Sequence, residues 1–497
     1  MAMEERHIVA IDLGTYKTSL TVAGINGDNI QILFYRKIPS DGIRYSYVFN
    51  SGKAAKVVRK LVEEAESELK IKIRRAIVGM PKYNVRQESN SGKLDRSIEE
   101  CISAEEIENL KNMAQETYPL QHPDVEEVFG TVAQSFSNGD EIGLTENDMI
   151  GVSSSVIQGN FKIFIGKKQH LHNIDMIFKD LGIDIIRKYF TPDSIAKAVL
   201  TPGEMENGVA LIDLGAGVTS VSIYYRNIMR HYAAIPFGGN SITSDIKTEC
   251  QIPGELAENI KKAFGGCMPD KLQNLSEKTL HIRSGSMAPN TQIQVKFLSE
   301  IITARMKEII DAVLYEIQMS GFADNLRSGV VITGGGAGLM NCGNYIKEMS
   351  GYDIRSGAPI RNLFSAPGYD SIYNADAEVS AGLVITAKND RIPECTAGAD
   401  APDTFPEIEI ERSAGETAVP QENTPEEDNY SGTVFGVPEE DGTAVKDDRK
   451  PGKSGKGSGS GKGNRPGKED KEKNSGIIWE IGNLFKGFYD SLDKEKA

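Results

Sequence analysis

Two segments far apart in this 497-residue chain carry nearly the same pattern. Residues 7–20 read HIVAIDLGTYKTSL, and residues 209–223 read VALIDLGAGVTSVSI. Each is a run of apolar, β-branched residues that places one aspartate at the end of a predicted strand. A glycine-containing turn and small hydroxyl residues follow at once. A chain with two such units is expected to contain two similar α/β halves.

The turn after each aspartate is suited to an anion. Glycine lets the backbone approach closely with its N–H groups pointing inward, and threonine and serine hydroxyls add donors. An aspartate beside phosphates can orient water on a bound Mg²⁺. A single copy is also consistent with an ordinary buried strand that ends in Asp-Leu-Gly. Two copies, which begin at Asp12 and Asp213, predict two similar domains that close on one polyphosphate.

A third segment, GVVITGGGAGLMN at residues 329–341, is another buried strand that breaks into glycines before a predicted helix. Gly334, Gly335 and Gly336 fit a place where side chains would be in the way, such as the flat face of a base or sugar. The alternative is a tight strand-to-helix connection. The segment therefore predicts either a nucleoside loop or a compact turn.

Composition excludes several classes of protein. A chain of 497 residues exceeds what one hydrophobic core normally holds, so two or more domains are expected. The net charge of −15 disfavours a nucleic-acid partner. The five cysteines have no CxxC spacing, which predicts free thiols of a reducing compartment. We expect no signal peptide, and no apolar run reaches the length of about 18 residues that a membrane-spanning helix needs.

The chain changes character near residue 393. Residues 393–475 are rich in Pro, Gly, Ser, Glu, Asp and Lys and hold almost no large apolar residues. Such a stretch cannot bury enough surface to offset its chain entropy, so we predict a disordered linker. Its distal part, residues 451–475, is basic.

The linker leads to a predicted amphipathic helix at residues 476–493. Because such a helix has no core of its own, its apolar face must find a membrane interface, a partner's groove or the parent domain. The only tryptophan of the chain and the preceding basic stretch favour an anionic membrane surface. The expected membrane-facing residues recur at helical spacing: Ile477, Ile478, Trp479, Ile481, Leu484, Phe485, Phe488 and Leu492.

The order of the three glycine motifs, at residues 12–18, 213–219 and 333–338, resembles the actin, Hsp70 and sugar-kinase superfamily. Residues 6–390 together with the terminal helix are similar, more narrowly, to the bacterial cell-division FtsA family. The segments that carry this resemblance are AIPFGGNSITSDI at 234–246, AENIKKAFG at 257–265, VITGGGAGL at 331–339 and IRSGAP at 354–359.

The resemblance implies an actin-like α/β fold of two RNase-H-like lobes with inserted subdomains, followed by the disordered tail and the amphipathic helix. Residues 191–200 would form the helix that connects the lobes. The implied divisions, in chain order, are the first part of subdomain 1A at 6–83, an inserted 1C-type subdomain at 84–166, the end of 1A at 167–205, the first part of 2A at 206–244, subdomain 2B at 245–321, the second part of 2A at 322–392, the linker at 393–475 and the helix at 476–493.

The resemblance also implies ATP and Mg²⁺ as ligands. Asp12 and Asp213 would hold water on the metal, and the resemblance implies slow or regulated hydrolysis. Because no His, Cys or Ser nucleophile arrangement is apparent, phosphoryl transfer to water would rely on positioning by Asp12 and Asp213. The residues implied to cradle phosphates are Gly14, Thr15, Lys17, Thr18, Gly215, Ala216, Gly217 and Thr219. Those implied to border the nucleoside are Glu258, Lys261, Gly334, Gly335 and Gly336.

As a member of such a family, the chain would polymerise, hold FtsZ filaments at the inner face of the cytoplasmic membrane at the septum, and recruit other division proteins. The inserted subdomain would take part in filament contacts. Arg305 is a candidate for gripping the acidic C-terminal tail of FtsZ, or else a solvated arginine on a helix surface. Rival classes are another actin-like scaffold, a small-molecule kinase with a sugar pocket, and an Hsp70-like ATPase.

Overall fold

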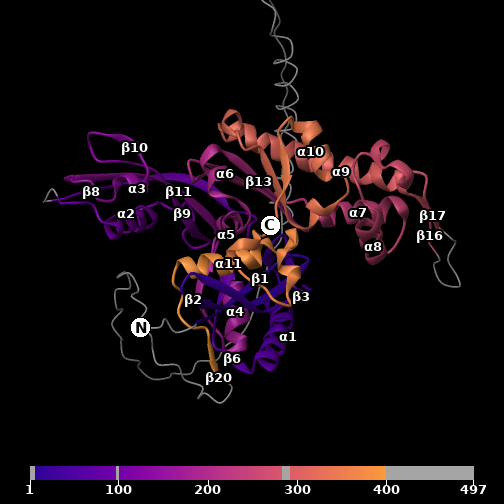
Figure 1. The fold of residues 1–497 in the computed structure, drawn as a ribbon, viewed down its shortest axis with the longest axis horizontal. Helices are drawn as coiled ribbons and strands as arrows, with labels where there is room; N and C mark the ends of the chain where they lie inside the picture. The colour runs from indigo at the N-terminus through magenta and orange to yellow at the C-terminus, as the bar shows by residue number, and fades with distance from the viewer. Residues whose placement is uncertain (1–5, 97–99, 283–290, 399–497) are drawn as a thin grey trace, which may run out of the picture. The chain divides into compact units, whose positions relative to one another are not determined.

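The computed structural model describes residues 6–96, 100–282 and 291–398 (Figure 1). The expected terminal helix and nearly all of the expected linker lie outside these residues. No helix in the described ranges combines the length and the apolar character needed to cross a membrane. The predicted α/β class is confirmed, because two five-stranded sheets with the same order of strands organise the fold.

The first lobe is built on a mixed sheet in the order β12-β7-β1-β2-β3. Strands β1 (Arg6–Leu13), β2 (Lys17–Asn26) and β3 (Asn29–Pro39) form an antiparallel meander. Strands β7 (Arg75–Gly79) and β12 (Asp184–Tyr189) add to the other side of β1 in parallel. Most residues of β1 and β2 are buried, as expected for near-continuous apolar runs at the centre of a covered sheet.

The second lobe repeats this plan in the order β15-β14-β13-β18-β19. Strands β13 (Val209–Leu214), β14 (Thr219–Tyr225) and β15 (Ile228–Ile235) form the meander. Strands β18 (Val330–Thr333) and β19 (Ile354–Ser356) pair in parallel on the far side of β13.

The repeat extends to single residues. Asp12 lies opposite Ser19 in the β1–β2 ladder, and Asp213 lies opposite Ser220 in the β13–β14 ladder. Each aspartate is followed by one more pair before the turn that joins the two strands, Leu13 with Thr18 and Leu214 with Thr219. The two aspartates therefore occupy equivalent positions in the two lobes.

Two helices pack against each other between the sheets, α5 (Thr191–Val199) and α11 (Glu378–Asn389) (Figure 1). Helix α5 is the one expected at residues 191–200. A Cβ at Gly382 of α11 would lie 2.2 Å from the carbonyl oxygen of Ser194, so the glycine permits this close approach. On the first sheet, α1 (Ser51–Leu69) packs against β2, β3 and α4 (Lys168–Leu181).

Within the expected insertion at 84–166, a separate four-stranded sheet has the order β10-β9-β11-β8. Its strands are β8 (Arg86–Asp95), β9 (Glu126–Ser137), β10 (Ile142–Leu144) and β11 (Val156–Lys167). Helix α2 (Ala104–Glu116) begins with a capping box between Ser103 and Glu106. It is followed along the chain by the short α3 (Glu146–Met149). This sheet has its own core, in which Phe136 and Phe161 meet edge to face at 5.9 Å.

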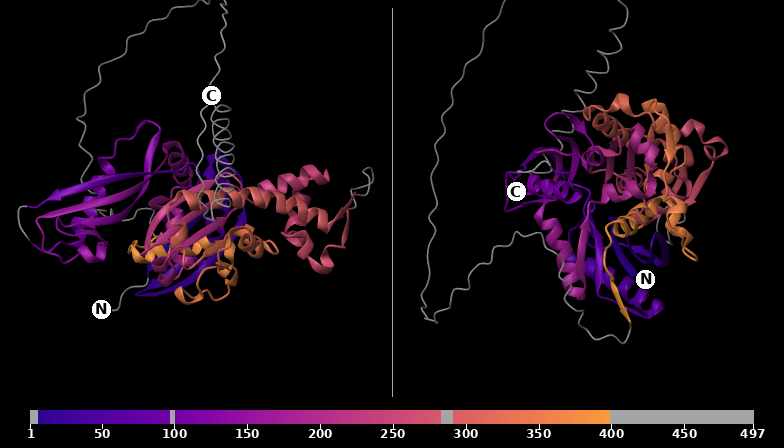
Figure 2. Two further views of the ribbon diagram at one scale, coloured as in Figure 1. Left: turned by 90° about the horizontal axis from the view of Figure 1, so that it is seen from above. Right: turned by 60° about the vertical axis from the view of Figure 1, so that its left-hand side comes forward.

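Between β15 and β18 the second lobe carries a largely helical segment. Helices α7 (Gly239–Cys250) and α8 (Gly254–Phe264) lead to the hairpin of β16 (Thr279–Ile282) and β17 (Thr291–Gln294). The long α9 (Val295–Met319) then packs against α7. This hairpin and the four-stranded sheet lie on opposite sides of the folded unit (Figure 2). The remaining helices of the second lobe are α6 (Pro202–Asn207) and α10 (Cys342–Ser350).

The described chain ends by returning to the first lobe. Strand β20 (Thr396–Gly398) pairs antiparallel with β6 (Ile71–Ile73). The N–H of Cys395 donates to the carbonyl oxygen of His7 at 2.9 Å. The buried Cys395 and the strand after it belong to the folded unit, so the expected boundary at residue 393 is placed too early. All five cysteines are free thiols, as predicted.

Candidate functional site

The two aspartate turns face each other across the lobes. A Cβ added at Gly217 would lie 2.9 Å from the side-chain Oγ1 and Cγ2 of Thr15 and 3.2 Å from the backbone nitrogen of Tyr45. The Thr15 hydroxyl also accepts a hydrogen bond from the N–H of Ser46 at 2.8 Å. The structure thus brings together the two turns that the sequence paired by pattern alone.

Both turns have the same local geometry. A Cβ at Gly14 would lie 2.6 Å from the carbonyl oxygen of Lys17, and one at Gly215 would lie 2.6 Å from that of Val218. Such contacts leave no room for a side chain, so each turn requires glycine at its first position. Between these points lie Thr15 and Tyr16 in one turn and Ala216 and Gly217 in the other. The turns meet at two small residues, Thr15 and Gly217.

Asp213 is almost fully buried and binds a cation that the sequence analysis did not identify. Its Oδ2 accepts a hydrogen bond from Nζ of Lys82, which belongs to the first lobe. The two side chains are 3% and 12% exposed. Burial alone would lower the pKa of Lys82. The negative charges of Asp213 and Glu378 have the larger combined effect and raise the pKa of the lysine. Asp213 Oδ1 has no hydrogen-bond partner among the described residues.

Further carboxyl groups surround this ion pair. Burial is the main cause that raises the pKa of Asp12. Burial and the charges of Asp213 and Asp12 raise the pKa of Glu378, at the start of α11, to about 8, against the opposing effect of Lys17 and Lys82. Glu378 is therefore largely protonated at neutral pH.

Lys17 and Lys37 share one carboxylate at the edge of this cluster. The Nζ atoms of Lys17 and Lys37 lie 3.0 and 2.7 Å from Oδ2 of Asp376. Lys17, which belongs to the first turn, is thereby held close to the candidate site, and Asp376 is a further residue that the sequence analysis missed.

The two equivalent threonines differ in their contacts. Thr18 Oγ1 lies 2.8 Å from Oγ of Ser40, which donates to the carbonyl oxygen of Gly14 at 2.7 Å. The hydroxyl of Thr219 is fully buried and has no partner within the part of the chain that the structure describes. An unpartnered buried hydroxyl costs free energy unless a ligand or water satisfies it.

Helices α7 and α8 support the second turn from behind. The N–H of Gly239 donates to the carbonyl oxygen of Gly215 at 2.9 Å, and that of Asn240 donates to Ala216 at 2.8 Å. Lys261 Nζ donates to the carbonyl oxygen of Gly239 at 2.8 Å and lies 2.7 Å from the Glu258 carboxylate. The predicted pair Glu258 and Lys261 therefore lies directly behind this turn.

The glycine loop after β18 packs against the second aspartate. Gly334 has φ +82°, and a Cβ there would lie 2.4 Å from Oδ1 of Asp213. A Cβ at Gly336 would lie 2.9 Å from both the Cβ and the carbonyl oxygen of Leu214. These two glycines are explained by close packing, whereas a Cβ at Gly335 would meet nothing within 4 Å. Gly335 and Gly338 are the glycines of this loop beside which a Cβ would find open space.

A second contact joins the lobes at the first turn. The ammonium of Lys262, on α8, lies 4.2 Å from the ring centroid of Tyr16 and donates a hydrogen bond to its hydroxyl oxygen. The Tyr16 side chain is otherwise exposed. This cation–π contact lies next to Thr15 in sequence, and it connects the first turn with the helix that supports the second.

Arg305 lies away from the two turns, on α9. Its Nε and Nη2 donate to the two carboxylate oxygens of Asp245 at 2.6 and 3.0 Å, and its Nη1 donates to Glu308 at 2.5 Å. Its guanidinium also lies over the ring of Phe237 at 5.5 Å. Arg305 is thus engaged by its own neighbours, and an acidic peptide would have to share or replace these contacts.

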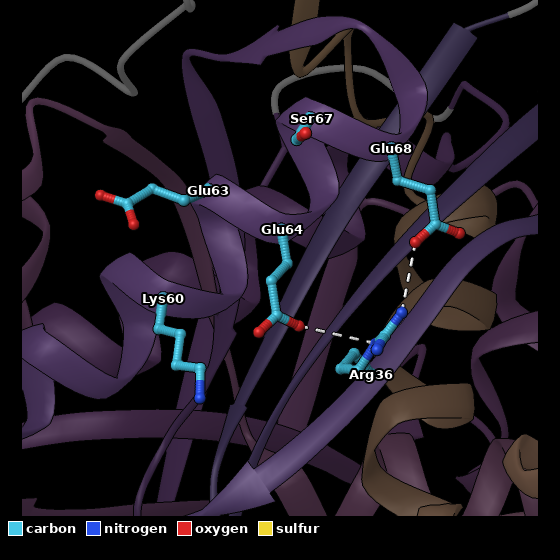
Figure 3. Close-up of a pocket in the computed structure, with 6 residues that line it drawn as sticks. All are labelled: Arg36, Lys60, Glu63, Glu64, Ser67 and Glu68. Atoms are coloured by element: carbon cyan, nitrogen blue, oxygen red, sulfur yellow. Dashed lines mark hydrogen bonds and ion pairs between the residues drawn. The ribbon is translucent and has the colours of Figure 1, made fainter.

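A hollow between α1 and β3 is also lined by charged residues (Figure 3). Arg36 lies 3.6 Å from Glu64 and 3.2 Å from Glu68, and so neutralises two of the three glutamates of the lining. This hollow lacks the matched glycine turns, so the cluster around Asp12 and Asp213 is the stronger candidate.

The cluster fits a polyphosphate with a divalent cation. Asp213 Oδ1 and Thr219 Oγ1 are buried and unpartnered in the described ranges, Gly335 leaves space, and Lys17 and Lys82 supply positive charge. Among the described residues no group of three or more His, Cys, Asp or Glu side chains could hold a metal alone. A Mg²⁺ here would therefore be held by phosphate oxygens and water beside the aspartates, as this ion prefers.

Comparison with known proteins adds independent information. Residues 210–374 match the family described as "Cell division protein FtsA". Proteins of that name from Neisseria meningitidis serogroup B and Borreliella burgdorferi are 27% and 28% identical over 361 and 362 residues. These alignments cover 72% of this chain and 85% and 86% of the relatives. The solved "PilM-PilN type IV pilus biogenesis complex" has a similar fold, with a TM-score of 0.55 at 12% identity, over 76% of this chain and 98% of that chain.

Proposed function

We propose that the chain is an FtsA-like, actin-like cell division protein, as its similarity to proteins of that name supports, and that it binds ATP·Mg²⁺ between its lobes and anchors FtsZ filaments to the inner face of the cytoplasmic membrane. The observation that best supports the nucleotide site is the meeting of two equivalent turns, with Gly217 in contact range of Thr15. Anion binding at such turns follows from inward-facing backbone N–H groups.

Different residues of the chain contact the metal, the phosphates and the nucleoside. Asp12 and Asp213 would hold water on the metal. The phosphates would lie between the two turns, against Gly14, Thr15, Lys17 and Thr18 on one side and Gly215, Ala216, Gly217 and Thr219 on the other. Gly335 and its neighbours, with Glu258 and Lys261, border the nucleoside. Mg²⁺ would screen the phosphate charge. Phosphoryl transfer to water would rely on positioning by Asp12 and Asp213, and hydrolysis is slow at most, as the resemblance to the FtsA family implies.

Nucleotide acts as a switch for assembly. A ligand that touches both turns at once favours the arrangement in which the lobes are close, because it binds that arrangement better than an open one. Subunits fixed in this arrangement polymerise through repeated identical contacts. The polymer then presents many copies of the C-terminal helix at once, and avidity converts weak single anchoring into firm attachment.

The proposed partners are anionic lipid, the FtsZ C-terminal tail and other division proteins. The apolar face at Ile477, Ile478, Trp479, Ile481, Leu484, Phe485, Phe488 and Leu492, which lies outside the described residues, inserts into anionic lipid. The FtsZ C-terminal tail binds at the second lobe, where Arg305 exchanges its exposed contact with Glu308 for a carboxylate of the peptide. The filament recruits other division proteins at the septum.

Sedimentation with anionic liposomes tests this function in one experiment. The full chain is expected to pellet with liposomes more completely with ATP·Mg²⁺ than without nucleotide, and to carry an FtsZ tail peptide into the pellet. The peptide should remain in the supernatant when the chain is omitted. An ATP-independent pellet would contradict the switch, and a pellet without peptide would contradict the FtsZ partner.

Removal of residues 477–492 is expected to lower the pelleted fraction at least about fivefold, since the apolar face provides the buried area for lipid binding. ATP affinity, measured by calorimetry, should stay within about twofold of the full chain, because the described site does not include these residues. Trp479→Glu is the point-variant version, and Lys486→Gln, on the polar face, is its control. Unchanged pelleting of the shortened chain would contradict the membrane anchor.

A further inference from the structure

Lys82 is the cation of the candidate site that the pattern of the two turns does not account for. It follows β7 in the first lobe, yet its ammonium binds Asp213 at the end of β13 in the second. Both side chains are nearly buried, so the pair spans the two lobes at the place where the turns meet.

The internal repeat shows that Lys82 holds a special position. Strands β7 and β18 are each the parallel neighbour of the strand that carries the aspartate, with Val78 opposite Ile11 and Ile332 opposite Ile212. The fourth residue after Val78 is Lys82, and the fourth after Ile332 is Gly336. The first lobe therefore carries a lysine where the second lobe carries its glycine loop.

The backbone of Lys82 is fixed from both lobes while its ammonium has spare donors. Its N–H donates to Oγ of Ser46 at 3.2 Å, and its carbonyl oxygen accepts a hydrogen bond from the Tyr232 hydroxyl. Of the three N–H groups on Nζ, one has a hydrogen-bond partner among the described residues, Asp213 Oδ2. The ammonium can thus reach a new oxygen by rotating its flexible stem, without movement of the loop.

We propose that Lys82 binds the terminal phosphate of the nucleotide and makes the site prefer a nucleoside triphosphate to a diphosphate. This rests on the proposed ATP·Mg²⁺ site. In the proposed site Asp213 would hold water on the metal beside the phosphates. Lys82, which is paired with Asp213, supplies a cation there that can bind the terminal phosphate of a triphosphate. A diphosphate lacks that group and leaves Lys82 on Asp213.

Calorimetric titration of the full chain with ATP and with ADP, both with Mg²⁺, tests this role. Lys82→Gln is expected to weaken ATP binding about tenfold or more while ADP affinity changes less than about threefold, because a charge-assisted hydrogen bond is lost only with ATP. Lys82→Arg keeps the charge and should retain the preference for ATP. Lys188→Gln removes a lysine of β12 that pairs with Asp175 of α4, outside the two turns, and should leave both affinities unchanged.

A second variant covers the risk that Lys82→Gln strands a buried Asp213 charge and fails to fold. Lys82→Gln combined with Asp213→Asn removes both charges, and it should bind ATP and ADP with similar affinity. An ATP preference that persists in the foldable variants, or an equal loss for both nucleotides in Lys82→Gln, would overturn the assignment while the proposed function stands. Wild-type protein that binds neither nucleotide would overturn both.

Discussion

Gly217→Val is expected to weaken nucleotide binding about 100-fold. Even a Cβ at this position would lie 2.9 Å from the side chain of Thr15 and 3.2 Å from the Tyr45 nitrogen, and valine adds two methyl groups. Overpacking of this kind costs about 1–3 kcal/mol, and each 1.4 kcal/mol changes an equilibrium tenfold. The cost falls on the close arrangement of the turns, which is the arrangement that the ligand needs.

The measurement is ATP affinity by calorimetry, with circular dichroism to show that the fold is retained. Gly203→Val is the matched control, because Gly203 lies in the same half of the chain, on α6, and a Cβ there would meet nothing within 4 Å. Its ATP affinity should equal that of the wild type. ATP affinity of Gly217→Val within about twofold of wild type would show that the ligand does not need the turns in contact.

Glu378→Gln is expected to make the nucleotide-free protein about 4 kcal/mol more stable near pH 7.5. The folded protein holds the pKa of Glu378 at about 8, above its ordinary value of 4.5, because of burial and the charges of Asp213 and Asp12, which Lys17 and Lys82 only partly offset. The unfolded chain therefore releases this proton at lower pH than the folded chain does. The free energy of unfolding falls as pH rises from about 4.5 to about 8, by up to about 1.4 kcal/mol per unit.

Urea unfolding between pH 4.5 and 8.5 measures this effect. Glutamine cannot ionise, so the variant should lack that share of the decline and should match the wild type most closely at the acid end. Glu63→Gln, at an exposed position of α1, should follow the wild-type profile. Parallel profiles for the wild type and Glu378→Gln would show that Glu378 ionises normally in the folded protein.

The sheets and the pairing of the two turns could be predicted from the sequence for a simple reason. The strands β1 and β13 are continuous apolar runs that end in the same Asp-Leu-Gly letters, and buried strands of parallel or mixed sheets have this composition. The local sequence pattern was therefore enough to predict two similar lobes and the equivalent positions of Asp12 and Asp213.

The remaining charges could not be predicted, because folding brings them together from distant parts of the chain. Lys82 and Asp213 are 131 residues apart in sequence, and neither Glu378 nor Asp376 belongs to a motif. A signal did exist. Lys82 comes soon after a fully apolar stretch, and Glu378 begins a helix whose following nine residues are all buried. An isolated charge beside such stretches indicates a buried partner.

The reasons for the glycines were also hidden from the sequence. Three consecutive glycines at 334–336 suggested the face of a base or sugar, with a tight connection as the alternative. Two of the three are required by the nearby backbone of Leu214 and the carboxylate of Asp213. A glycine can be required because one backbone approaches another or because a backbone approaches a ligand. Both cases give glycine in the sequence, and only the interatomic distances in the structure distinguish them.

The short strand β20 has a mechanical consequence. Any tension applied to the chain beyond residue 398 reaches the folded unit through the three residue pairs of β20 with β6 and through the hydrogen bonds of Cys395 to His7, Arg74 and Arg75. These contacts are few, whereas the sheet behind them is long and buried. Under load, we expect these contacts to break before the first lobe is deformed, which would protect the turns at Asp12 and Asp213 from force.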